Sequence, residues 1–121
     1  MAPRAPLGRI TREEDFRRVY RHGARRSTRL VVLHLLSNDL NSVRLGVAVG
    51  RRFGGAVARN RLRRRLREAV RAASQEIGAG VDVVVVPREP AGNAAYASLR
   101  EEVTTALRAA GVLALAEGEG P

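Results

Sequence analysis

The sequence contains no cysteine, no lysine and few aromatic residues. Without cysteine, the chain has no means to form a disulfide framework, a zinc-thiolate site, an iron–sulfur cluster or a thiol nucleophile. Aromatic residues make up 3% of the chain, and they are Phe16, Tyr20, Phe53 and Tyr96. We therefore expect an aliphatic core and few surfaces on which nucleic-acid bases could stack.

Long apolar runs are also missing. No stretch approaches the 18 or so residues that a membrane-spanning helix needs. Residues 1–7 lack the apolar segment of a secretory signal, so a cytoplasmic location is expected. The 121 residues predict a single domain spanning 1–121, with an ordered core at about 7–112 and flexible termini.

The charge is strongly positive and unevenly distributed. The chain has 22 arginines against 12 acidic residues, a net charge of +10. Residues 51–71 contain nine arginines and one acid, residues 1–29 contain nine and three, and residues 72–121 are net acidic. Such a segregated basic surface predicts an anionic partner, of which nucleic acid is the commonest. Arginine suits this role because its planar fork binds phosphate in a bidentate manner.

Hydrophobic periodicity predicts a mixed α/β sandwich of two layers, in the order αββαβα. The first helix should span residues 11–21, with Thr11 and Glu14 forming a capping box at its start. The pattern also allows one extra short strand within residues 24–50. The remaining elements are strands at 30–36, 43–50 and 81–86 and helices at 56–77 and 94–110.

The predicted helix 56–77 has two distinct faces. On a helical wheel its apolar residues share an arc of about 120°; they are Ala58, Leu62, Leu66, Ala69, Val70, Ala73 and Ile77. The opposite side presents Asn60, Arg64, Arg67 and Arg71. Like charges four residues apart on a helix repel, and Glu68 is the only acid in residues 51–71. The stripe is therefore typical of a surface that binds polyphosphate.

The segment from Arg44 to Glu68 resembles the signature of the bacterial ribonuclease P protein component. It reads RLGVAVGRRFGGAVARNRLRRRLRE and includes the Arg-Asn-Arg motif at residues 59–61. The upstream segment 15–23 resembles the first helix of that family, and the later strand and helix follow in the expected order. The resemblance extends from about Leu7 to Ala110.

This resemblance implies a protein subunit that binds a catalytic RNA and the 5′ leader of precursor tRNA, assisting endonucleolytic removal of the leader. The RNA would carry the chemistry with bound Mg²⁺, with no protein active site or protein metal ligands. It also implies a left-handed crossover through the basic helix, and no obligate protein partner or membrane is evident. Phe16, Tyr20 and His34 would line the leader cleft. The implied RNA-binding residues are Arg51, Arg52, Arg59, Asn60, Arg61, Arg63, Arg64, Arg67 and Arg71.

Two other functions compete with this interpretation. A protein nuclease needs clustered carboxylates or a catalytic histidine, but the only histidines, His22 and His34, lie in different predicted elements. A ribosomal protein or general RNA chaperone of similar fold also fits the composition. Two roles stay open as well: Phe16 could belong to the core, and His34 could contact the leader or serve packing.

Overall fold

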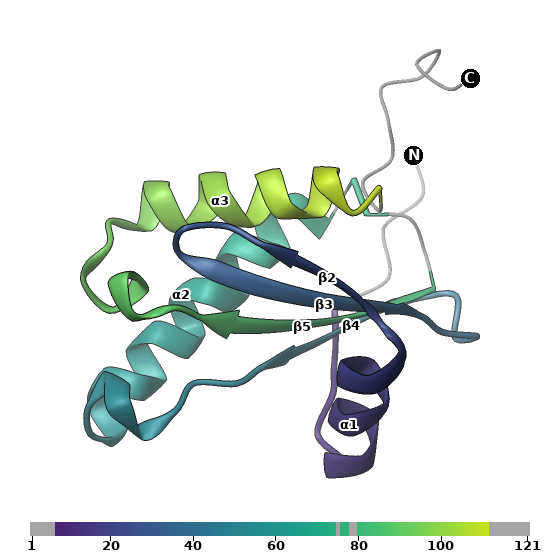
Figure 1. Cartoon of the computed structure of the whole chain (residues 1–121), viewed down its shortest axis with the longest axis horizontal. Helices are drawn as coiled ribbons and strands as arrows, with labels where there is room; N and C mark the ends of the chain where they lie inside the picture. The colour runs from purple at the N-terminus through teal and green to yellow at the C-terminus, as the bar shows by residue number, and fades with distance from the viewer. Residues whose placement is uncertain (1–6, 75, 78–79, 112–121) are drawn as a thin grey trace.

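The computed structural model describes residues 7–74, 76–77 and 80–111. These described residues form five strands and three α-helices, with two short 3₁₀ helices (Figure 1). The strands are β1 (Gly8–Arg9), β2 (Ala24–Ser27), β3 (Val31–Ser37), β4 (Val43–Val47) and β5 (Val81–Pro87). The helices are α1 (Glu13–His22), η1 (Arg51–Phe53), α2 (Ala56–Ser74), η2 (Glu89–Asn93) and α3 (Tyr96–Ala109).

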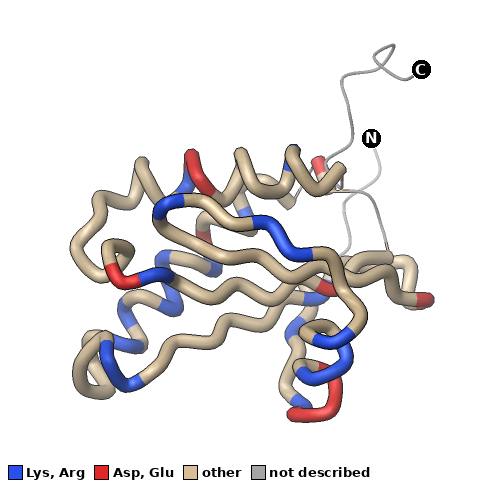
Figure 2. The backbone as a smooth tube through the Cα atoms, viewed as in Figure 1, with Lys and Arg blue, Asp and Glu red and all other residues tan. Residues whose placement is uncertain are grey.

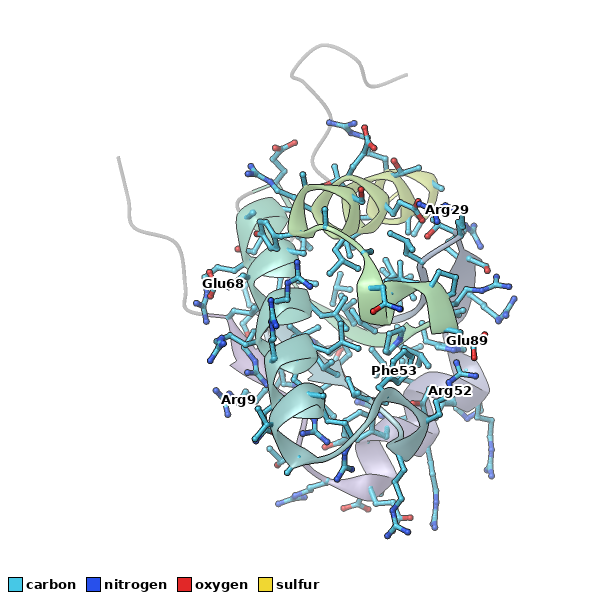
Figure 3. All side chains as sticks on the ribbon, turned by 90° about the vertical axis from the view of Figure 1, so that its left-hand side faces the viewer. Arg9, Arg29, Arg52, Phe53, Glu68 and Glu89 are labelled. Atoms are coloured by element: carbon cyan, nitrogen blue, oxygen red, sulfur yellow. The ribbon has the colours of Figure 1, made fainter. Side chains whose placement is uncertain are left out.

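The strands form one mixed sheet in the order β1-β4-β5-β3-β2. β4 and β5 are parallel and are joined through α2, whereas β3 runs antiparallel to β5 and β2 antiparallel to β3. In Figure 1 both parallel strands point left and β5 lies above β4. Figure 3, which is turned by 90°, shows that α2 lies behind the sheet in the view of Figure 1. This geometry makes the crossover left-handed, against the usual rule, as the family resemblance implies.

The two faces of the sheet carry different layers. Alternate residues of the central strands, such as Leu33 and Val85, join a large aliphatic core with α2 and α3. The intervening residues face α1, where Ile10, Val19 and Val84 form a smaller buried cluster. The mixed α/β class is therefore confirmed. Helix α1 adds a partial layer on the opposite face, beyond the two layers expected.

The start of α1 differs from the prediction. Arg12 occupies the N-cap position and no side chain caps the helix, so the capping box of Thr11 and Glu14 is wrong. The backbone N–H of Ile10 donates to the Leu45 carbonyl at 2.9 Å. Because this pairing keeps the chain extended up to residue 10, the helix begins one residue later than a Thr11 N-cap would place it.

The other differences concern short or terminal elements. β2 is the optional extra strand, while β1 was not predicted because two residues carry no periodic pattern. β4 ends at residue 47 rather than 50, α2 at residue 74 rather than 77, and η2 precedes the last helix. The predicted flexible termini, residues 1–6 and 113–121, lie outside the described residues.

Candidate RNA interface

Helix α2 separates an apolar face from a basic one, as its sequence predicts. Leu62, Leu66, Ala69, Val70 and Ala73 are buried against the sheet and α3. On the other side Asn60, Arg64 and Arg71 are exposed, and Arg67 is partly buried. Figure 2 shows basic positions following one another along α2. The helix therefore presents a ridge of guanidinium groups, which we call the α2 stripe (Asn60, Arg64, Arg67 and Arg71).

The turn before α2 brings two further arginines to its first turn. Arg51 and Arg52 are exposed on η1, and Arg52 lies over the Phe53 ring with its guanidinium carbon 5.1 Å from the ring centroid. Gly54 then adopts a φ of 115°, a conformation that only glycine adopts readily. The glycine allows the chain to turn sharply from η1 into the helix.

The Arg-Asn-Arg motif at residues 59–61 spreads its side chains in different directions. Asn60 accepts a hydrogen bond from Nη1 of Arg63 at 2.7 Å through its Oδ1 atom, so it orients that guanidinium. Arg61 is exposed, whereas Arg59 is partly buried. The buried Nε of Arg59 has no hydrogen-bond partner among the described residues.

Arg9 extends the basic surface and was missed by sequence reasoning. Burial, followed by the charges of Arg9, Arg71 and Arg63, lowers the pKa of Arg67, although an arginine remains cationic at neutral pH. Figure 3 shows Arg9 beside α2. Because this proximity arises from the pairing of β1 with β4, no local sequence signal could have revealed it.

Three aromatic rings line the opposite face of the sheet, next to α1. The Tyr20 and His34 rings meet edge to face with centroids 4.8 Å apart, and the Phe16 and Tyr20 centroids are 6.4 Å apart. Burial, and then the Arg25 charge, lowers the pKa of His34, so the imidazole is neutral at pH 7. The three predicted cleft residues therefore lie together, with Tyr20 the most open at 42% exposure.

Phe16 has a packing role as well. A Cβ atom placed on Gly46 would lie 2.6 Å from Cε1 of Phe16, so the ring rests directly on the backbone of β4. Phe16 also packs against the buried cluster that contains Ile10 and Val84. Phe16 therefore helps to hold α1 against the sheet.

An ion-pair network fixes α1 to the sheet, and sequence reasoning missed it. Asp82 of β5 is fully buried and accepts hydrogen bonds from Arg44, Asn38 and Arg18. Asp15 of α1 adds a second carboxylate 3.6 Å from Arg44. The available signal was the lone acid in the otherwise apolar run VDVVVV of β5.

The described residues lack two further features. No group of three His, Cys, Asp or Glu side chains there is arranged to hold a metal ion. None of the described helices combines the length and the apolar character needed to cross a membrane.

Comparison with known proteins gives the family. The sequence model of the family "Ribonuclease P" matches residues 6–111. The chain belongs to the ribonuclease P protein family. It is 39% identical over 114 residues to the ribonuclease P protein component of Roseiflexus castenholzii, and the aligned region covers 93% of each chain. Over 106 residues it is 40% identical to that of Chloroflexus aurantiacus, covering 87% of this chain and 78% of the relative.

Solved ribonuclease P proteins share the fold. The Staphylococcus aureus protein superposes with a TM-score of 0.81 at 29% identity, covering 89% of this chain and 99% of that one. The Thermotoga maritima protein gives a TM-score of 0.77 at 30% identity, covering 84% and 96%. The chain is therefore a protein component of ribonuclease P, which acts with an RNA subunit in tRNA processing. The alternative of a ribosomal protein or general chaperone is not favoured.

Proposed function

We propose that the protein uses α2 and η1 to bind the catalytic RNA of ribonuclease P and uses the cleft beside α1 to bind the 5′ leader of precursor tRNA. The protein would position the substrate, while the RNA subunit cleaves the leader endonucleolytically. The residues in these roles are those implied by the family resemblance, together with Arg9, which the fold brings to the same surface.

The α2 stripe is the observation that carries this proposal. Residues 51–71 contain nine arginines and a single acid, Glu68. Glu68 forms an ion pair with Arg71. The remaining like charges repel one another, and the repulsion is relieved when a polyanion binds and releases its condensed counterions. An RNA helix or junction supplies phosphates over the length of α2.

The aromatic residues beside α1 favour a single-stranded ligand. Bases of unpaired RNA stack on aromatic rings, and such stacking tolerates different sequences. The Tyr20 ring is exposed and the His34 ring is partly exposed; the raised pKa of Tyr20 and the lowered pKa of His34 keep both rings uncharged at neutral pH. A leader of variable sequence matches this chemistry better than a paired stem does, because the bases of a stem are already stacked.

The polar residues of the protein favour a supporting role rather than a catalytic one. The carboxylates nearest the basic surfaces are engaged by arginines, as Glu68 is by Arg71 and Asp82 by Arg44. His34 packs against Tyr20. Mg²⁺ would activate the attacking water and stabilise the leaving oxygen, and it would be held chiefly by RNA and substrate phosphates.

Reconstitution with ribonuclease P RNA tests the proposal. At low Mg²⁺ concentration, we expect the protein to accelerate cleavage of precursor tRNA at the mature 5′ end. The protein without RNA should give no cleavage at any Mg²⁺ concentration. Robust turnover by an RNA-free preparation, or no acceleration by the protein, would contradict the proposal.

A further inference from the structure

A groove lies on the flank of α2 that faces η2. It has a volume of about 910 Å³ and lies between the first two turns of α2 and the segment that leads into α3. Phe53, Val57, Ala94 and Ala95 supply an apolar lining, and Arg61 and Arg65 add positive charge. Figure 3 faces this end of the molecule and shows Phe53 next to η2. None of the lining residues is acidic.

The groove is distinct from the two surfaces already described. On the helical wheel Arg61 and Arg65 point about 100° or more away from Asn60 at the centre of the α2 stripe. The rings of Phe16, Tyr20 and His34, where we place the leader cleft, lie on the α1 face of the sheet, whereas α2 packs on the other face. Neither the stripe nor the cleft therefore accounts for an apolar hollow with arginines at this place.

We propose that this groove binds an unpaired nucleotide of the RNA subunit, with its base against Phe53 and Val57 and its phosphates near Arg61 and Arg65. Positive charge without acidic residues favours binding of a polyanion. An apolar floor favours a flat ring that loses its contact with water on binding. A base outside a helix combines both properties, and proteins recognise RNA mostly through such bases. Val57 is 85% exposed, so a bound base would cover a side chain that contributes little to the core.

The position of the groove favours the RNA subunit over the substrate. It continues the α2 surface that the proposed function assigns to the catalytic RNA, and this inference rests on that proposed function. A leader strand in the cleft beside α1 lies across the sheet from it. An RNA that covers the α2 stripe needs only to turn around the helix to reach Arg61 and Arg65.

The absence of cysteine makes a direct test possible. Val57→Cys would carry a photo-crosslinking group into the groove, and the variant would be assembled with ribonuclease P RNA and precursor tRNA. Leu40→Cys is the matched control, because Leu40 is also an exposed hydrophobic residue and lies between β3 and β4, at the other end of the strands. Arg64→Cys places the same crosslinking group on the α2 stripe, and its crosslink to the RNA subunit tests the proposed function independently of the groove.

The expected result is a crosslink from residue 57 to an unpaired nucleotide of the RNA subunit, with none from residue 40. A crosslink from residue 57 to precursor tRNA, to paired RNA or to a second protein would overturn the inference, as would the absence of a crosslink. If residue 64 crosslinks in those cases, the proposed function stands and only the groove fails. If residue 64 also fails to crosslink to the RNA subunit, both fail.

An affinity measurement gives an independent test. Val57→Asp should weaken binding of the RNA subunit about tenfold or more, which is in the range of a lost base contact. Leu40→Asp adds the same charge elsewhere and should have little effect. Val57→Ser removes the apolar contact without a charge, so affinity should fall while its dependence on salt stays unchanged. Unchanged affinity in both Val57 variants, with intact circular dichroism, would contradict the inference.

Discussion

Arg44 binds Asp82 through two parallel hydrogen bonds, from Nε to Oδ1 at 2.8 Å and from Nη2 to Oδ2 at 2.6 Å. The two residues are neighbours on the parallel strands β4 and β5, on the side of the sheet that faces α1. Arg18 of α1 reaches the same carboxylate at 3.2 Å. A bidentate pair of this kind is both strong and geometrically specific. Because Arg18 and Asp15 of α1 both contact this pair, the network holds α1 against the sheet, beside the rings that we assign to the leader.

Replacing Asp82 should destabilise the protein in a pH-dependent way. Burial raises the pKa of Asp82, but hydrogen bonds from Arg44 and Asn38 outweigh it and the net pKa is lowered. The unfolded chain then binds more protons than the folded one below about pH 4. The stabilisation is therefore present above that pH and lost as the pH falls through the folded-state pKa. We expect Asp82→Asn to lower the free energy of unfolding by about 3 kcal/mol at pH 7.

Urea denaturation from pH 7 to pH 2.5 measures this effect. The difference between the native protein and Asp82→Asn should shrink as the solution becomes acidic. Asp39→Asn, at an exposed acid in the turn between β3 and β4, is the control and should change little. A difference for Asp82→Asn that stays constant over the whole pH range would show that the charge of Asp82 is not responsible.

Gly46 should be intolerant of a side chain because Phe16 rests on it. A Cβ atom there would lie 2.6 and 2.7 Å from two atoms of the Phe16 ring, so the ring or α1 must shift. Overpacking of this kind costs about 1–3 kcal/mol. We expect Gly46→Ala to destabilise the protein by that amount, and Phe16→Leu to recover part of the loss in the double variant. Additive effects in the double-mutant cycle would contradict the contact.

Tyr20 should contribute to the binding of precursor tRNA but not of mature tRNA. A base stacked on an aromatic ring is worth about 1–3 kcal/mol, and the ring of Tyr20 is the most open of the three. We expect Tyr20→Ala to weaken binding of precursor tRNA to the assembled enzyme by this amount. Tyr20→Phe keeps the ring and should retain the affinity. Equal losses for precursor and mature tRNA would assign Tyr20 to packing instead.

The sequence predicted the elements whose pattern is local and strong. The apolar arc and arginine stripe of α2 follow from helical spacing alone, and the buried strand β5 follows from its run of valines. The two-residue β1 and the start of α1 were missed, because backbone pairing between distant segments determines them. The same is true of Arg9 beside Arg67 and of the Asp82 network, in which Arg18 and Asp82 form a hydrogen bond although they are 64 residues apart in the chain. The rings of Phe16 and Tyr20 could be placed on one helix face, but their contact with His34 required the fold.

The central claim is that the α2 stripe binds the phosphates of the RNA subunit, and the salt dependence of binding tests it most directly. Each phosphate contact contributes about −0.7 to −0.9 to the slope of log affinity against log salt, so about five contacts give a slope near −4. The double variant Arg64→Ala/Arg67→Ala should reduce the magnitude of this slope by about 1.5. Arg100→Ala/Arg108→Ala removes the same charge from exposed positions of α3 and should leave the slope close to that of the native protein. An unchanged slope in the α2 variant, with its circular dichroism intact, would mean that RNA binds elsewhere.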